Sequence, residues 1–343
     1  MDTLTLTRPD DCHLHLRDGP ALAAVLADSA RRFARAVVMP NLRPPLTTVV
    51  AALAYGERIR AALPAGADFT PLLTLYLTEA TTGEELRAAK AAGIVGVKLY
   101  PAGATTHSDA GVRRVEAIYP QLEVMQAIDL PLLVHGEVTD PAVDVFDREA
   151  VFIERHLKPV IERFAALRVV LEHVTTRDGV DFVRGARAGV AASITPQHLS
   201  MNRGALFEGG LRPHHYCLPV LKREEHRAAV LAAAISGDAK FFLGTDSAPH
   251  PLRDKHSACG CAGIYSAHAG IELYAEAFEA AGALDKLEAF ASHHGADFYR
   301  LPRNTGTLTL RRAPARVPDS LPFGDDVLVP LRAGGRVAWQ VVD

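Results

Sequence analysis

Six residues of the sequence form a set that can bind metal ions, and most of them end short apolar runs. The set comprises His13, His15, Lys98, His135, His173 and Asp246. His13 and His15 are two positions apart, so on a strand both imidazoles face one side and can hold one cation. Such a pair alone is also typical of two hydrogen-bonded histidines. The additional histidines and the aspartate favour a metal site.

Lys98 is the unusual member of this set, because an ammonium group cannot bind a cation. It follows the run 94–97 at the end of a predicted buried strand, where a salt-bridged lysine is the simplest interpretation. Two neighbouring divalent metals and loss of hydration would instead favour the neutral amine, which reacts with carbon dioxide. The resulting carbamate is a carboxylate on a long arm and could bridge both metals.

The elements that must position these residues follow from the alternation of apolar and amphipathic segments. Short β-branched runs occupy 4–16, 36–39, 69–76, 94–99, 132–135, 168–173, 190–195 and 241–246, the first being irregular and broken by Pro9. Helix-length segments separate them, which predicts an α/β fold, a (β/α)8 TIM barrel. The C-terminal ends of barrel strands meet at one mouth, so residues scattered along the sequence can converge there.

Local signals support the predicted outer helices and a C-terminal extension. Thr82 with Glu85 matches a capping box, and the apolar positions 115, 118, 122 and 125 share one helix face. After about residue 301 come short strand-like runs at 308–310, 327–331 and 337–342. We predict one domain over 1–343, with the barrel at about 1–300 and the extension at about 301–343. Too few residues precede His13 to form half of a separate β-sandwich.

Composition narrows the class of partner. Lys plus Arg number 37 against 40 for Asp plus Glu, a formal charge of -3, so no nucleic-acid partner is expected and a small-molecule substrate is favoured. No apolar run approaches the ~18 residues of a membrane span, and the acidic N-terminus is unlike a secretion signal, which predicts a cytoplasmic protein. The four cysteines are expected to be reduced, and the spacing of Cys259 and Cys261 matches no common structural zinc site.

Other histidines carry weaker signals. We assign no chemistry to His156, His226, His293 and His294, which lie in helical or late segments. The long loop after the seventh predicted strand contains His198, His214 and His215. For these three, a site role and a surface role both stay open.

Several motifs together resemble the class II dihydroorotases of the amidohydrolase superfamily. They are HLHLRD at 13–18, MPN at 39–41, KLYPAGATT at 98–106, VHGE at 134–137, EH at 172–173, ITPQHL at 194–199, CLPVLKR at 217–223, GTDSAPH at 244–250 and CGCAG at 259–263. The similarity extends from about residue 9 to beyond 300. The H-x-H motif alone would indicate only the superfamily, whereas the full set is specific.

The resemblance implies a zinc-dependent cyclisation of N-carbamoyl-L-aspartate to dihydroorotate, reversible, in pyrimidine biosynthesis. It implies one zinc on His13, His15 and Asp246, a second on His135 and His173, and carbamylated Lys98 (N6-carboxylysine) and a hydroxide bridging both. Asp246 would shuttle the proton. The implied substrate contacts are His15, Arg17, Asn41, His135 and His250, the backbone of Leu218 and Ala262, and a mobile loop with Thr105 and Thr106. A homodimer is also implied. Gly103 departs from close relatives and leaves the stiffness of this loop in doubt.

Arg17 can bind the substrate carboxylate with two parallel hydrogen bonds, or it can pair with Asp18 at the rim. A hydantoinase or allantoinase would share the metals but not this clamp, so Arg17 and Asn41 argue against those enzymes. A non-catalytic barrel scaffold is the remaining alternative. The complete metal-binding set argues against it.

Overall fold

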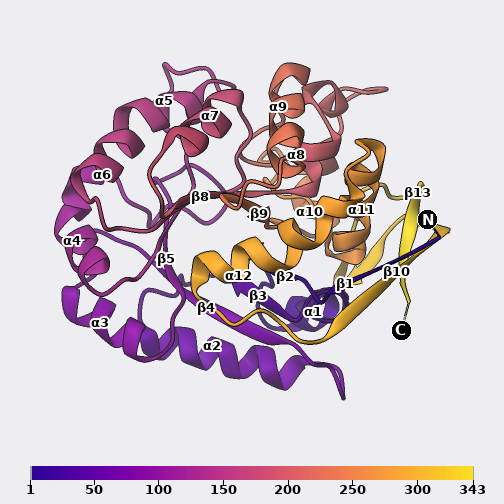
Figure 1. The fold of residues 1–343 in the computed structure, drawn as a ribbon, viewed down its shortest axis with the longest axis horizontal. Helices are drawn as coiled ribbons and strands as arrows, with labels where there is room; N and C mark the ends of the chain where they lie inside the picture. The colour runs from indigo at the N-terminus through magenta and orange to yellow at the C-terminus, as the bar shows by residue number, and fades with distance from the viewer. Residues whose placement is uncertain (1, 343) are drawn as a thin grey trace.

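The centre of the fold is a ring of eight parallel strands, seen in a computed structural model that describes residues 2–342 (Figure 1). The strands are β2 (Asp10–Leu14), β3 (Arg35–Val38), β4 (Thr70–Tyr76), β5 (Gly96–Leu99), β6 (Leu132–Val134), β7 (Val169–Leu171), β8 (Val190–Ile194) and β9 (Phe241–Leu243). Each strand pairs with the next in chain order. A parallel bridge between Leu14 of β2 and Ser247, in the segment that follows β9, closes the ring and confirms the predicted barrel.

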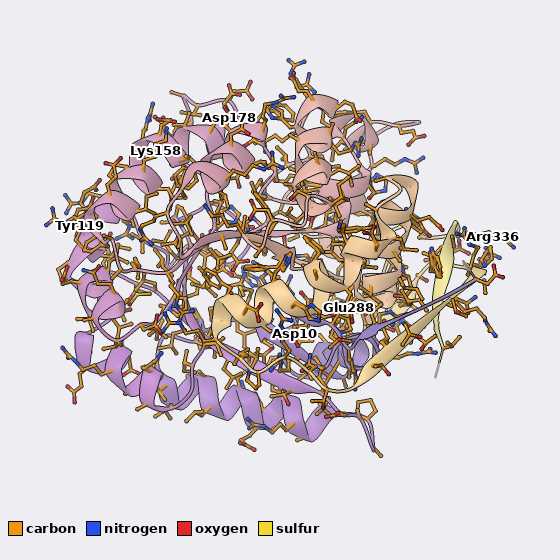
Figure 2. The ribbon with its side chains drawn as sticks, in the orientation of Figure 1. Asp10, Tyr119, Lys158, Asp178, Glu288 and Arg336 are labelled. Atoms are coloured by element: carbon orange, nitrogen blue, oxygen red, sulfur yellow. The ribbon has the colours of Figure 1, made fainter. Side chains whose placement is uncertain are left out.

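Helices cover the outside of the barrel, and α2 to α7 curve around the strands in Figure 1. The α-helices are α1 (Pro20–Arg32), α2 (Val49–Ala62), α3 (Gly83–Ala91), α4 (Tyr119–Ala127), α5 (Arg148–Phe152), α6 (Lys158–Arg163), α7 (Arg177–Gly185), α8 (Pro196–Ser200), α9 (Glu224–Ala234), α10 (Leu252–Lys255), α11 (Gly270–Ala280) and α12 (His294–Tyr299). Charged side chains such as Lys158 and Asp178 lie on the outer rim (Figure 2). None of the described helices is long and apolar enough to cross a membrane.

The predicted capping box at α3 is half correct. The Thr82 side chain caps the helix by accepting a hydrogen bond from the backbone N–H of Glu85 at 3.1 Å. The Glu85 carboxylate does not return to Thr82 but accepts from the backbone N–H of Val49 at 2.6 Å, at the start of α2. Glu85 therefore joins two neighbouring helices.

The barrel interior is apolar at the N-terminal ends of the strands. Cys12, Leu133, Val170, Ala191 and Phe242 form one buried cluster there, together with Tyr299 of α12. The carbonyl of Phe298, also in α12, accepts a hydrogen bond from Arg168 at 2.5 Å, just before β7 begins. This end of the barrel is therefore filled and covered, and polar chemistry is confined to the other end.

An irregularity in β2 brings its histidines to the interior. The register between β2 and β3 shifts between Asp11 and Leu14. Cys12 belongs to the interior cluster, yet Leu14 belongs to the outer core, so strict alternation is broken between them. A bulge of this kind redirects side chains. It allows His13 to follow Cys12 into the barrel.

The segment 4–16 was predicted as one irregular barrel strand broken by Pro9, but only its second part belongs to the barrel. The segment forms two strands, β1 (Thr3–Thr7) and β2, separated at Pro9, which lacks the N–H that a continuous ladder needs. β1 pairs antiparallel with β10 (Thr307–Arg316), which pairs with β13 (Arg336–Val342). The two termini consequently lie close together beside the barrel (Figure 1).

The C-terminal extension departs from its predicted strand limits. β10 is longer than the predicted run 308–310 because its outward positions carry polar residues such as Arg311 and Arg312, which an apolar-run criterion excludes. The run 327–331 is reduced to β12 (Asp326–Leu328), which forms a hairpin with β11 (Leu321–Phe323). Leu310 and Trp339 belong to the same apolar cluster as the outer barrel. The domain boundary near residue 301 stays a prediction.

Trp339 is expected to fasten this extension to the barrel. Its side chain is 0% exposed, and its indole N–H donates to the Glu279 carboxylate of α11 at 3.1 Å. Trp339→Ala should lower the free energy of unfolding by about 3–5 kcal/mol. Chemical denaturation would measure this, with Val50→Ala, at an 80% exposed position, as a control that changes stability by less than about 0.5 kcal/mol. Equal small losses in both variants would contradict this role of Trp339.

Candidate metal and substrate site

Three donor atoms converge at the C-terminal mouth of the barrel. His13 Nε2 lies 3.3 Å from both His15 Nε2 and Asp246 Oδ1, and His15 Nε2 lies 3.0 Å from Asp246 Oδ1. All three side chains are buried. Donor atoms around a tetrahedral zinc ion, each about 2.0–2.2 Å from it, stand roughly 3.3–3.6 Å apart. The spacing therefore fits a shared cation.

Barrel closure produces this convergence. The backbone N–H of Asp246 donates to the His13 carbonyl at 2.8 Å, and that of His15 donates to the Ser247 carbonyl at 3.2 Å. Gly244 permits the close approach, because a Cβ there would lie 3.0 Å from the His13 Cβ and 2.9 Å from that of Ser193. The segment after β9 is thus held directly against β2.

A second group of candidate ligands lies beside the first. The rings of His135 and His173, which follow β6 and β7, are 4.8 Å apart, and the His13 and His173 rings are 5.1 Å apart. His173 Nδ1 and Lys98 Nζ are buried and have no hydrogen-bond partner among the described residues. Burial lowers the pKa of Lys98 to about 8. A buried amine without a partner, among potential ligands, fits a carbamate that binds metal.

Two buried carboxylates orient the imidazoles, and the motif analysis gave neither a role. Glu172 contacts His13 Nδ1 closely, and Glu137 Oε2 lies 2.7 Å from His135 Nε2. Burial acts to lower the pKa of His13, but Glu172 raises it overall. Carboxylates that hold one ring nitrogen leave the other free for metal. The sequence signal for these two carboxylates was their position beside the candidate ligands His173 and His135, in the EH and VHGE motifs.

The backbone at several site residues lies in the left-handed region. His173 and Asp246 have φ 43 and φ 45, and Arg17 has φ 60. Non-glycine residues adopt this conformation at an energetic cost and tend to do so at functional sites. None of the three lies within a strand, and the positive φ falls where the chain leaves β2, β7 and β9.

The site opens into a pocket with an empty volume of about 340 Å3. Its lining residues are His13, His15, Arg17, Asn41, Tyr100, Thr105, Thr106, His135, His173, Leu218, Asp246, Ala248, Ala262 and Gly263. Eleven of these are predicted site residues, whereas Tyr100, Ala248 and Gly263 carried no predicted role. Lys98 and His250 lie outside the lining set, although His250 Nε2 lies 3.0 Å from both Arg17 Nη2 and the Ala262 carbonyl oxygen, which belong to lining residues.

One side of the pocket is rich in donors. Arg17 Nε donates to the Pro249 carbonyl at 2.9 Å, and Arg17 Nη2 lies 3.0 Å from His250 Nε2. Asp18, the alternative partner of Arg17, instead pairs with Arg58 at 2.7 Å. Burial and the Arg17 charge hold the pKa of His250 well below its usual value, so this imidazole is neutral. Arg17 therefore keeps its positive charge at the pocket.

The predicted loop lies across the pocket. The Thr106 hydroxyl donates to the Ala262 carbonyl at 3.3 Å, and the Asn41 amide donates to the Thr106 carbonyl at 3.2 Å. Within the loop, Ser108 Oγ accepts from the Thr105 N–H at 2.9 Å. These bonds form a compact turn next to Ala262. The predicted mobility of the loop stays a prediction.

The three histidines left open have separate environments. His198 is buried, and its Nε2 lies 3.0 Å from the Pro219 carbonyl, in the loop that carries Leu218. His215 Nδ1 lies 2.8 Å from the Ala205 carbonyl. His214 Nε2 lies 3.0 Å from His256 Nε2 near the surface. None of them lines the pocket.

A (β/α)8 barrel with candidate metal ligands at its C-terminal mouth defines a metal-dependent hydrolase of the amidohydrolase class. Comparison with known proteins agrees, because residues 10–314 match the amidohydrolase family. A dihydroorotase from Methylobacillus flagellatus is 66% identical over 342 residues, which cover 99% of each protein.

Solved structures give the same result. The chain is similar to a dihydroorotase from Campylobacter jejuni, with a TM-score of 0.91 and 36% identity over 99% of this chain and 98% of that one. It is also similar to a Saccharomyces cerevisiae dihydroorotase in complex with 5-fluoroorotic acid, with a TM-score of 0.91 and 31% identity over 100% and 99% of the two chains. The chain therefore belongs to the amidohydrolase family and, within it, to the dihydroorotases.

The contact between Glu172 and His13 predicts a dependence of metal binding on this carboxylate. Glu172→Gln removes the charge that holds the His13 ring, so zinc affinity should fall roughly 10- to 100-fold. Competition with a chelator would measure the affinity. Glu154→Gln, at an exposed carboxylate paired with Lys158, is the control and should bind zinc normally. Unchanged affinity in Glu172→Gln would remove Glu172 from the metal site.

Proposed function

We propose that the protein is a dihydroorotase that interconverts N-carbamoyl-L-aspartate and (S)-dihydroorotate in pyrimidine biosynthesis. The observation that carries this proposal is the placement of a candidate metal-binding triad and a half-buried arginine on one small pocket. The pocket thus offers groups for a cyclic amide and for a carboxylate. The choice of dihydroorotate as the substrate rests on the similar proteins, which are named dihydroorotases.

Two zinc ions are assigned to the site. His13, His15 and Asp246 would hold the first, His135 and His173 would hold the second, and carbamylated Lys98 would serve both. The buried Lys98 amine supports this assignment, because it has no hydrogen-bond partner among the described residues and a carbamate would give the side chain polar partners. Bound zinc supplies a Lewis acid for the amide carbonyl and lowers the pKa of water to about 7.

Asp246 moves the proton. Burial acts to raise its pKa, but His13 and His15 hold the pKa well below its usual value, so the carboxylate is ionised and can act as a base. During hydrolysis Asp246 accepts a proton from the attacking water and transfers it to the ring nitrogen as the C–N bond breaks. During ring closure the same carboxyl starts protonated, and water leaves as the C–N bond forms.

The remaining pocket residues bind and enclose the substrate. Arg17 receives the carboxylate in a two-bond contact, with Asn41 and His250 beside it. His15 and His135 border the reacting amide, and Leu218 and Ala262 provide backbone contacts. Thr105 and Thr106 close over the ligand and exclude water, which strengthens the electrostatic interactions within.

The family resemblance also supports a homodimer located in the cytoplasm. Analytical ultracentrifugation of the purified protein would test the assembly. A single species with the mass of one chain would contradict it.

A direct assay tests the proposed function. Purified protein is expected to contain two zinc ions per chain and to consume dihydroorotate, followed by its absorbance, while leaving a hydantoin and allantoin unchanged. Turnover of the hydantoin in place of dihydroorotate would indicate a different cyclic amidohydrolase. Absence of both zinc and turnover would favour a scaffold.

Lys98→Ala should lose much of its zinc and nearly all activity, because the bridging group serves both metals. A short carboxylic acid added to the assay should partly restore turnover. Lys222→Ala removes another buried lysine, which donates to the Val220 carbonyl at 2.9 Å away from the pocket lining, and should retain its zinc. Normal zinc content and turnover in Lys98→Ala would exclude the carbamate.

Arg17→Met should chiefly weaken the binding of an anionic substrate, by ~2–5 kcal/mol, because a desolvated charge pair is lost. A small uncharged cyclic imide should be affected much less. The ratio of kcat/KM values for the two substrates in wild type and variant measures the effect. If both substrates lost the same factor, Arg17 would support the metals rather than the carboxylate.

A further inference from the structure

Lys255 ends α10 and is buried, with 3% of its surface exposed. Its ammonium donates to three backbone carbonyls, those of Tyr216 at 2.9 Å, Cys261 at 2.8 Å and Gly263 at 3.0 Å. An ammonium group has three N–H donors, so all of them are used. The side chain therefore ties the loop after β8 to the loop after β9.

This ammonium is held by peptide dipoles. Within residues 2–342, no carboxylate forms an ion pair with Lys255, whose donors go to the three carbonyls. Burial lowers the pKa of Lys255 to about 8. Loss of the ammonium would leave three buried carbonyls without this donor, which is unfavourable. The loop geometry therefore depends on this one side chain.

The two carbonyls that Lys255 holds in the second loop belong to residues on either side of Ala262. The Ala262 carbonyl itself has other partners, His250 Nε2 at 3.0 Å and the Thr106 hydroxyl at 3.3 Å. The carbonyls of residues 261 and 263 therefore bond to Lys255, whereas the carbonyl of residue 262 between them contacts His250 and Thr106. Gly263 completes the contact, because its N–H donates to the Tyr216 carbonyl at 3.0 Å.

A glycine is required at this junction. Gly263 has φ 154, and a Cβ would lie 2.7 Å from the Ala248 carbonyl oxygen and 2.8 Å from His250 Cδ2. The close packing leaves little freedom for Ala262 to shift without breaking the bonds to Lys255. Leu218 is only two residues beyond Tyr216, so the same ammonium fixes both backbone segments that border the pocket.

We propose that Lys255 is a positioning residue for substrate binding, which acts by fixing the backbone at Ala262 and Leu218 on the carboxylate side of the pocket. This inference rests on the proposed function. Lys255 does not line the pocket and is not assigned to either metal. Its effect should therefore fall on substrate affinity rather than on zinc content.

The test compares Lys255→Met with Lys240→Met. Lys240 also donates to three backbone carbonyls, those of Val183, Arg184 and Ala186, but it precedes β9 at the opposite end of the barrel. Lys255→Met should raise KM for dihydroorotate about tenfold or more with a smaller change in kcat, whereas Lys240→Met should leave KM unchanged. Zinc content should match wild type in both. If the two variants lose a similar amount of thermal stability and only Lys255→Met raises KM, the effect of Lys255 is on positioning and not on folding.

Hydrogen exchange of the zinc-loaded protein without substrate provides a second readout. Lys255→Met should accelerate exchange in peptides covering 214–221 and 257–265, and Lys240→Met should not. If Lys255→Met fails to fold, Lys255→Gln retains two donors and should change both readouts in the same direction by less. Unchanged KM, unchanged exchange, or loss of zinc in the Lys255 variant would overturn the proposal. Failure of wild type to convert dihydroorotate would instead refute the proposed function, and the exchange measurement would still test the fixed loops.

Discussion

The site depends on the seam that closes the barrel between β2 and the segment after β9. Asp11 is central to it, because its buried carboxylate accepts from the N–H and hydroxyl of Thr245, at 2.8 Å and 2.6 Å, and from the N–H of His13 at 3.1 Å. Burial raises the pKa of Asp11 to about 7, although these hydrogen bonds act to lower it. Residues 234 positions apart in the sequence are thereby joined. Without this junction, Asp246 would not reach His13.

The candidate metal ligands are then oriented by contacts that cross the barrel interior. Glu172 holds His13 and accepts from the Ser193 hydroxyl at 2.8 Å, so strands β2, β7 and β8 meet at one carboxylate. Gly244 provides the space between Ser193 and His13. The apolar cluster at the opposite end supports this layer from below. Rigid placement of ligands in this way is what a metal site requires.

Sequence reasoning predicted the barrel and brought together the candidate ligands because both rest on repeated local patterns. Parallel strands require apolar runs, and their common direction places residues such as His135 and Asp246 at one mouth. The break at Pro9 was expected, but the pairing of β1 with β10 and the bulge after Asp11 were not, because both depend on the partner strand. Glu172 was missed because its partner His13 is 159 positions away in the sequence, and its place beside His173 in the EH motif does not reveal that contact.

The seam also holds the candidate metal ligands and Arg17, the proposed carboxylate-binding residue, at a fixed separation. The segment after β2 carries His15 and then Arg17, and the segment after β9 carries Asp246 and then His250. The two segments run side by side, so His15 lies 3.0 Å from Asp246 and Arg17 lies 3.0 Å from His250. Each segment thus carries one candidate metal ligand and one residue of the Arg17–His250 pair. The distance between the reacting amide and the carboxylate of a substrate must therefore match the distance between these two pairs of residues. The proposed substrate, a small ring bearing one carboxylate, would satisfy this constraint, whereas an uncharged ring would leave the half-buried Arg17 without a counter-charge.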